Sequence, residues 1–199
     1  MSNGDPARPN PRAIAYHGPL ADPRPFALAT QVMIAVGPLA YLAVMATGGR
    51  DSAVVWLVPV SSALFVIRVG LFLTWFHRCR RNAEHFGPGR HAFSEADAVG
   101  LWFHPRKMFW APRRAALDIW RACGGTGSPW LINAWWAAWL AKLASAFVFF
   151  CISGTVFDPD ATYVAQIGVV AAGLAILVIH QLTEAQDVMV GLKDRPAGR

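Results

Sequence analysis

The chain has 199 residues, of which 55% are hydrophobic and only 15% are charged. Soluble domains average about 45 to 50% apolar and about 25% charged residues, so this composition argues against a soluble protein and indicates an integral membrane protein. The net charge of +6 at pH 7 comes from basic residues that flank apolar segments, so we expect them to meet an anionic membrane surface and not nucleic acid.

Four apolar segments are each long enough to cross a bilayer, which takes about 20 helical residues. Lipid cannot hydrogen-bond to the backbone, so each segment is predicted to be an α-helix. The connections TGGRDS and FDPDAT are short, which predicts two antiparallel hairpins. The expected fold class is therefore an all-α integral membrane protein with four transmembrane helices, at residues 26–47, 53–76, 130–156 and 163–182.

Basic residues predict the orientation of these helices, because cytoplasmic loops carry the excess of arginine and lysine. Segment 1–25, loop 77–129 and segment 191–199 are all basic, and an even number of spans places them on one side. We therefore expect a single domain at residues 26–190 in the bacterial cytoplasmic (inner) membrane, with both termini and the loop in the cytoplasm. Segment 1–25 has no apolar run, which predicts a disordered tail and not a signal peptide.

The loop contains GLWFHPRKMFWAPRRAALDIWRAC, which is too charged to cross a bilayer and too aromatic to lie in water. Upstream of it, Ser94 predicts the start of a short helix. A second helix that begins at Pro112 would be amphipathic and would lie in the plane of the cytoplasmic interface. Its apolar face would hold Ala116, Ile119, Trp120 and Cys123, and its polar face Arg114, Asp118 and Arg121, spaced for ion pairs.

We expect this loop to bind anionic lipid or a protein partner through its cations, with tryptophans as anchors at the level of the headgroups. The alternative is that its apolar faces line a pocket against the transmembrane helices. The expected contact residues are Arg78, Arg80, Arg81, Arg106, Lys107, Arg113, Arg114 and Arg121, with Trp102, Trp110 and Trp120 as anchors.

Two cations, Arg68 and Lys142, lie inside predicted spans that contain no Asp or Glu. Unpaired charge within a membrane is costly, so each cation needs an explanation. The favoured interpretation is that both side chains extend to the inner headgroups, helped by Trp75 and Trp139. One alternative is a pocket that holds an anion such as a lipid phosphate or a carboxylate. Another is an ion pair with Glu184, just past the last span.

His180, Glu184 and Asp187 are spaced four and three residues apart, so they share one helix face. With His77 they could ligate a metal, and the two histidines could be axial ligands of a haem. We favour ion pairs from the two carboxylates to the arginines of the RCRR run, and we expect no cofactor. The three cysteines include no CxxC pair, so neither a disulfide framework nor a zinc ribbon is indicated.

Small residues follow one face of each of the last two predicted helices and would allow a neighbouring helix to approach closely. We expect them to pack within one bundle, and the alternative is a homodimer. The two stripes are Ala137, Ala141 and Ser145 in one helix, and Ala165, Gly168, Ala172 and Ala175 in the other.

Several motifs, taken together and in order, are similar to those of a known family. They are FLTWFHRCRRNAEHFGPG from residue 72, the GLWFHPRK stretch above, WWAAWLAKL from residue 135 and LTEAQ from residue 182. Over residues 72–186 the chain resembles the bacterial membrane-protein family described as domain of unknown function 4328. The resemblance implies the membrane architecture and no particular activity.

No nucleophile elbow, phosphate-binding loop or catalytic triad occurs in the sequence, so no enzyme is indicated. The expected function is that of a non-enzymatic scaffold or regulatory subunit, which binds anionic lipid or a protein partner. The alternative is a small transporter or membrane enzyme with an anion pocket around Arg68 and Lys142. A haem-binding or metal-binding membrane protein is less favoured.

Overall fold

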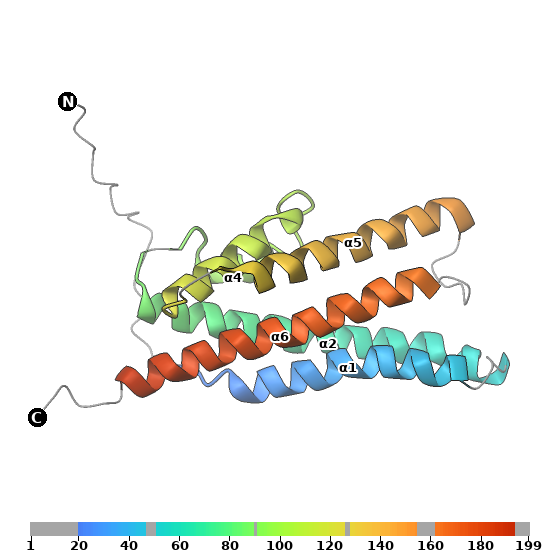
Figure 1. Cartoon of the computed structure of the whole chain (residues 1–199), viewed down its shortest axis with the longest axis horizontal. Helices are drawn as coiled ribbons and strands as arrows, with labels where there is room; N and C mark the ends of the chain where they lie inside the picture. The colour runs from blue at the N-terminus through green and yellow to red at the C-terminus, as the bar shows by residue number, and fades with distance from the viewer. Residues whose placement is uncertain (1–19, 47–50, 90, 126–127, 155–161, 194–199) are drawn as a thin grey trace, which may run out of the picture.

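The computed structural model describes residues 20–46, 51–89, 91–125, 128–154 and 162–193. These residues form α-helices and one short 3-10 helix, and no strand occurs among them (Figure 1). The elements are α1 (Arg24–Ala46), α2 (Asp51–Phe86), α3 (Glu95–Gly100), the 3-10 helix η1 (Lys107–Phe109), α4 (Ala111–Ala122), α5 (Trp130–Ser153) and α6 (Thr162–Lys193). The end of the bundle at which α1 begins and α2 and α6 end is called the α4 end below.

Three segments of the described helices are long and apolar enough to cross a membrane, at Ser62–Phe86, Trp130–Ile152 and Gln166–Val190. The all-helical prediction is confirmed for the described residues, but the four expected spans are corrected to three candidates. The predicted span at 26–47 does form α1. The side chains of this span are described only from residue 26 to Leu39. This stretch is shorter than the roughly 20 residues that a crossing needs. Most of the two predicted tails lies outside the described residues.

The long helices carry apolar side chains on the outside of the protein as well as between helices. Only 11% of the α5 segment is buried inside the protein, although its mean hydropathy is 1.6. Phe65 of α2, Phe147 of α5 and Leu177 of α6 are among the exposed apolar residues. A helix that is apolar on its outer face is suited to a lipid surrounding, where that face meets hydrocarbon and not water.

The buried core lies toward the α4 end, where α4 packs against α2, α5 and α6. Pro112 stands in the first turn of α4, as predicted, because it has no N–H to leave unbonded there. Ile119 and the polar Asp118 are both buried. The polar face of α4 is therefore partly buried at Asp118, where the N–H of Ala92 donates to Oδ2 at 3.1 Å. The predicted cap at Ser94 is confirmed, since its Oγ accepts the N–H of Asp97 at 3.1 Å.

Trp102 stands at the centre of an aromatic cluster that joins α2 to α5. The centroid of its ring lies 5.0 Å from that of Phe72 and 5.8 Å from that of Phe76, both in α2. On the α5 side it lies 6.3 Å from Trp135 and 6.0 Å from Trp139. Three of these four pairs are edge-to-face, an arrangement worth about 0.5 to 1.5 kcal/mol per pair beyond the burial of apolar area.

Asn82 of α2 holds the backbone that precedes α1. Its Oδ1 accepts the N–H of Ala21 at 2.9 Å, and its Nδ2 donates to the carbonyl oxygen of Ala21 at 2.7 Å. The same Nδ2 donates to Oε1 of Gln186 in α6 at 3.0 Å. Gln186 in turn donates to the carbonyl oxygen of Cys79 at 2.8 Å. Both amide side chains are buried, so this network links the start of α1 with α2 and α6 inside the fold.

We predict that Asn82→Ala lowers the stability of the protein, because it leaves Oε1 of Gln186 buried without this donor. An unsatisfied buried group costs about 1 to 3 kcal/mol, and each kcal/mol shifts Tm by roughly 2 to 4 °C in a chain of this size, so Tm in detergent should fall by roughly 2 to 12 °C. Thr74→Ala is the matched control, since the exposed Thr74 hydroxyl bonds only to Gly70 of its own helix. Equal Tm values for N82A and T74A would contradict this role.

Candidate functional site

Residues 103–110, between α3 and α4, form an exposed surface that is both basic and aromatic. Phe103, Phe109 and Trp110 are 67%, 51% and 53% exposed. Arg106 and Lys107 lie between them in the chain and are also exposed, and this stretch contains no acidic residue. These five side chains are called the basic aromatic surface.

The backbone of the basic aromatic surface is attached to α5. Nε1 of Trp136 in α5 donates to the carbonyl oxygen of Phe109 at 3.1 Å. Close by, Nε of Arg113 donates to Oδ1 of Asn133 at 2.9 Å, so the predicted contact residue Arg113 serves to fix α4 to α5. The surface is thus presented by a segment that is hydrogen-bonded to a long helix.

Three residues that were expected on the lipid-facing surface lie inside the fold. Trp120 is 7% exposed, and Trp102 forms the centre of the aromatic cluster. Arg80 is 2% exposed and donates to the carbonyl oxygen of Phe93 at 2.7 Å. The reason is that α2 continues well past its predicted span, to Phe86, so that α3 and α4 pack around the RCRRN run.

The other two arginines of this run are also engaged with the protein. Arg78 donates to the carbonyl oxygen of Asp22 at 2.7 Å, and its guanidinium lies 4.2 Å from the ring centroid of Phe26. Arg81 is half-buried. The run therefore organises the neighbouring segments and offers little free charge to a partner.

The predicted pairing of Asp118 with two arginines of α4 is confirmed. Its Oδ1 lies 3.7 Å from Nε of Arg114 and 3.2 Å from Nη1 of Arg121. The side chains of both arginines remain more than half exposed, at 58% and 56%. They satisfy the buried carboxylate and still add positive charge to the outside of α4.

Arg80 and Glu84 form a buried ion pair beneath this region, with Nη1 and Oε2 2.8 Å apart. Oε1 of Glu84 also accepts the N–H of Gly89 at 3.0 Å. Nearby, Nε2 of His91 lies 3.1 Å from the carbonyl oxygen of Ala83. Burial, and secondly the positive charge of Arg80, lower the pKa of His91 below its ordinary value of 6.5, so the neutral imidazole is favoured.

Arg68 and Lys142 lie one helical turn beyond the aromatic cluster, on the side away from the α4 end. The guanidinium of Arg68 lies against Gly37 of α1, where an added Cβ would stand 3.2 Å from Nη2. Cε of Lys142 lies 3.9 Å from the position that a Cβ would take at Gly168 of α6. Neither cation takes part in an ion pair within the described chain, and the expected alternative partner Glu184 binds elsewhere.

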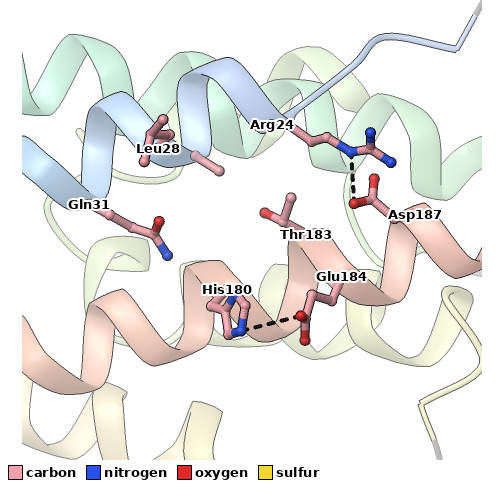
Figure 2. Close-up of a pocket in the computed structure, with 8 residues that line it drawn as sticks. Arg24, Leu28, Gln31, His180, Thr183, Glu184 and Asp187 are labelled. Carbon is pink, nitrogen blue, oxygen red and sulfur yellow. Dashed lines mark hydrogen bonds and ion pairs between the residues drawn. The ribbon is translucent and has the colours of Figure 1, made fainter.

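Glu184 lies in an open groove of about 270 Å³ between α1 and α6 (Figure 2). Its Oε1 is 3.3 Å from Nε2 of His180, and Oδ2 of Asp187 is 2.8 Å from Nε of Arg24. The ion pairs expected from the two carboxylates to the RCRR run are therefore wrong, because α1 brings Arg24 closer. Figure 2 shows that Arg24 contacts Asp187 and that His180 contacts Glu184, so each of the two carboxylates already has a partner within the groove.

The four residues considered as metal ligands are not brought together. Nε2 of His77 pairs with Oε1 of Glu95 in α3 at 3.4 Å, whereas His180 lies in the groove. The two histidines thus occupy different places in the fold. Among the described residues, no group of three or more His, Cys, Asp or Glu could hold a metal ion.

The small-residue stripe of α6 contributes to packing within the bundle. Ala175 is buried, and Gly168 and Ala172 are partly buried. In α5, by contrast, Ala137 and Ala141 are exposed. Packing between α5 and α6 therefore uses part of the predicted surface, and a homodimer remains a prediction.

Comparison with known families agrees with the motif resemblance. The family model described as Domain of unknown function (DUF4328) matches residues 40–184. The chain belongs to the DUF4328 family. No curated protein and no solved structure matches it. The matched region of this DUF4328 chain contains the basic aromatic surface, the aromatic cluster, Arg68 and Lys142.

The sequence patterns of this DUF4328 chain did not indicate Phe103 and Phe109 as exposed anchors, and indicated Trp102 and Trp120 instead. The available signal was the spacing of apolar residues. Trp120 repeats with a helical period from Pro112 onward, which predicts burial on a shared face. Residues 103–110 show no such period, so they have no common face to bury.

We predict that His91 makes stability depend on pH. The unfolded chain binds the proton at about pH 6.5 and the folded chain only at lower pH, so stability is lost as pH falls from about 6.5 toward the lower folded pKa. In H91Q, the fall in Tm between pH 7.5 and pH 5.5 should be smaller than in wild type. His104 is exposed, so H104Q is the control and should keep the wild-type fall. An unchanged fall in H91Q would contradict the assignment.

Proposed function

We propose that this DUF4328 protein is a multi-pass membrane scaffold whose basic aromatic surface binds anionic phospholipid headgroups. The observation that supports the proposal is the exposure of Phe103, Phe109 and Trp110 around Arg106 and Lys107. Large exposed aromatic side chains are unfavourable in water and favourable at the level of the headgroups. The two cations gain about 1 kcal/mol each beside an anionic bilayer.

The attachment of this surface to α5 supports a scaffold with a preformed contact. Because the Trp136 indole holds the carbonyl oxygen of Phe109, the cations are displayed without first ordering a flexible loop. Ordering costs about 1 to 2 kcal/mol per residue for the backbone, so a fixed segment keeps more of its binding energy. Arg114 and Arg121 on α4 add exposed positive charge next to it.

We infer that the protein crosses a bacterial cytoplasmic membrane as two antiparallel hairpins, with the α4 end in the cytoplasm. In support, α1 packs against α2, α5 packs against α6, and both described ends of the chain lie at the α4 end (Figure 1). Loop 77–129 and both terminal segments carry most of the basic residues, which favours the cytoplasmic side. This orientation brings the basic aromatic surface to the anionic inner leaflet.

The test is the affinity of the full-length protein in detergent for short-chain phosphatidylglycerol, measured by native mass spectrometry. The double variant R106Q/K107Q removes two charges worth about 1 kcal/mol each, so its Kd should rise by roughly tenfold or more. Affinity for short-chain phosphatidylcholine, which has no net charge, should stay the same.

The charge-matched control is R8Q/R12Q, which removes two arginines from the N-terminal segment. It should bind phosphatidylglycerol as the wild type does, because the proposed contact is local. Wild-type affinity in R106Q/K107Q, or an equal loss in the control, would rule out a specific lipid contact at the basic aromatic surface.

A further inference from the structure

Two hydrogen bonds fix how α1, α2 and α6 are aligned along the bundle axis near Arg68. Nε1 of Trp75 in α2 donates to Oγ1 of Thr183 in α6 at 3.1 Å, and Nε2 of Gln31 in α1 donates to the carbonyl oxygen of Ile176 at 3.2 Å. Arg68 lies seven residues before Trp75, and Ile176 lies seven residues before Thr183. The backbone of Arg68 therefore lies at about the same distance from the α4 end of the bundle as Gln31 does.

The side chain of Arg68 points away from the α4 end. Gly37, against which its guanidinium lies, is six residues after Gln31 and thus about 9 Å farther from the α4 end. Side chains of a helix lean toward its N-terminus, and α2 begins at the opposite end of the bundle. Arg68 therefore does not extend toward headgroups at the α4 end, which the sequence-based interpretation favoured.

The side chain of Lys142 in α5 lies at a similar distance from the α4 end. This helix begins toward the α4 end, so the side chain of Lys142 leans back toward Arg68. Gly37 lies six residues after Gln31, and Gly168 lies eight residues before Ile176, so the Arg68 guanidinium at Gly37 and Cε of Lys142 at Gly168 lie at about the same distance from the α4 end. The helices that carry these two glycines, α1 and α6, pack against each other. Lys142 is exposed on the outside of α5, and Arg68 is partly buried. Within a membrane both charges would lie in surroundings of low dielectric, where a charge that nothing neutralises is unfavourable.

The described part of the chain supplies no neutralising group. None of its ion pairs includes Arg68 or Lys142. In addition, Nε of Arg68 is buried and has no hydrogen-bond acceptor. Two cations without a carboxylate partner, one of them with a buried donor that has no acceptor, form a site that an anion would complete, since the anion would supply both the charge and the acceptor.

We propose that Arg68 and Lys142 together bind one phosphate-type oxyanion within the membrane-spanning part of the protein. The planar guanidinium can bind two oxygens of a phosphate, and the ammonium adds a compact charge. A lipid phosphate and free inorganic phosphate share this chemistry. The site lies beyond the aromatic cluster and is separate from the lipid contact of the basic aromatic surface.

The test measures binding of two probes, inorganic phosphate and short-chain phosphatidic acid, to full-length protein that carries R106Q/K107Q. This background removes the surface contact, so the two proposals succeed or fail separately. R68Q and K142Q should each weaken binding by at least about tenfold. Because both cations hold the same ion, the double variant should bind it more weakly than either single variant.

Charge-preserving variants keep the test valid if a Gln variant does not fold. R68K and K142R keep the charge and should each bind more tightly than the corresponding Gln variant, although R68K loses the second oxygen contact of the guanidinium. G37A should weaken binding several-fold without any change in charge, because its Cβ would crowd the guanidinium. G70A is the control, since a Cβ at Gly70 would meet no atom within 4 Å.

Saturable binding of inorganic phosphate would support the proposal with a free ion as the ligand. Binding of phosphatidic acid alone would support it with a lipid headgroup as the ligand. The proposal would be overturned if neither probe bound, or if R68Q and K142Q bound as the parent does.

Discussion

Aromatic rings, more than direct helix contact, join α2 to α5. The ring of Trp102 lies between Phe72 and Phe76 on one side and Trp135 and Trp139 on the other. Trp102 belongs to the segment that connects α3 to η1, so this connection is an internal part of the fold. The position of α4, and of the basic aromatic surface that precedes it, depends on this cluster. The charged residues of the basic aromatic surface thus follow directly, in the chain, an aromatic side chain that is inserted between two long helices.

The cluster also separates two chemical environments along the bundle. Toward the α4 end, buried polar groups satisfy one another, as in the Arg80–Glu84 ion pair and the bond between Asn82 and Gln186. Beyond the cluster, the outer faces of the helices are apolar and suited to hydrocarbon. Arg68 and Lys142 lie on this second side, and none of the ion pairs among the described residues includes either of them.

The helices could be predicted from sequence because apolar length is a local property, and α5 begins at the predicted residue, Trp130. The burial of Arg80 also had a local signal, since Glu84 follows it at the four-residue spacing of helical ion pairs. The bond between Asn82 and Gln186 joins residues 104 positions apart, and no local pattern reports such a contact. The direction of the Arg68 side chain could likewise not be predicted from sequence. It depends on how α1 and α2 are aligned by hydrogen bonds from Gln31 and Trp75 to α6.

The most direct test of the account is the side of the membrane on which residue 110 lies. In a C151S background the remaining thiols, Cys79 and Cys123, are buried, and burial raises the pKa of Cys123 to about 12, so both should react slowly with maleimides. W110C and D158C then place single reporters at the α4 end and in the FDPDAT connection. In intact bacterial cells, a membrane-impermeant maleimide should label residue 158 and not residue 110, and inverted vesicles should give the opposite result. Labelling of residue 110 in intact cells would contradict the account.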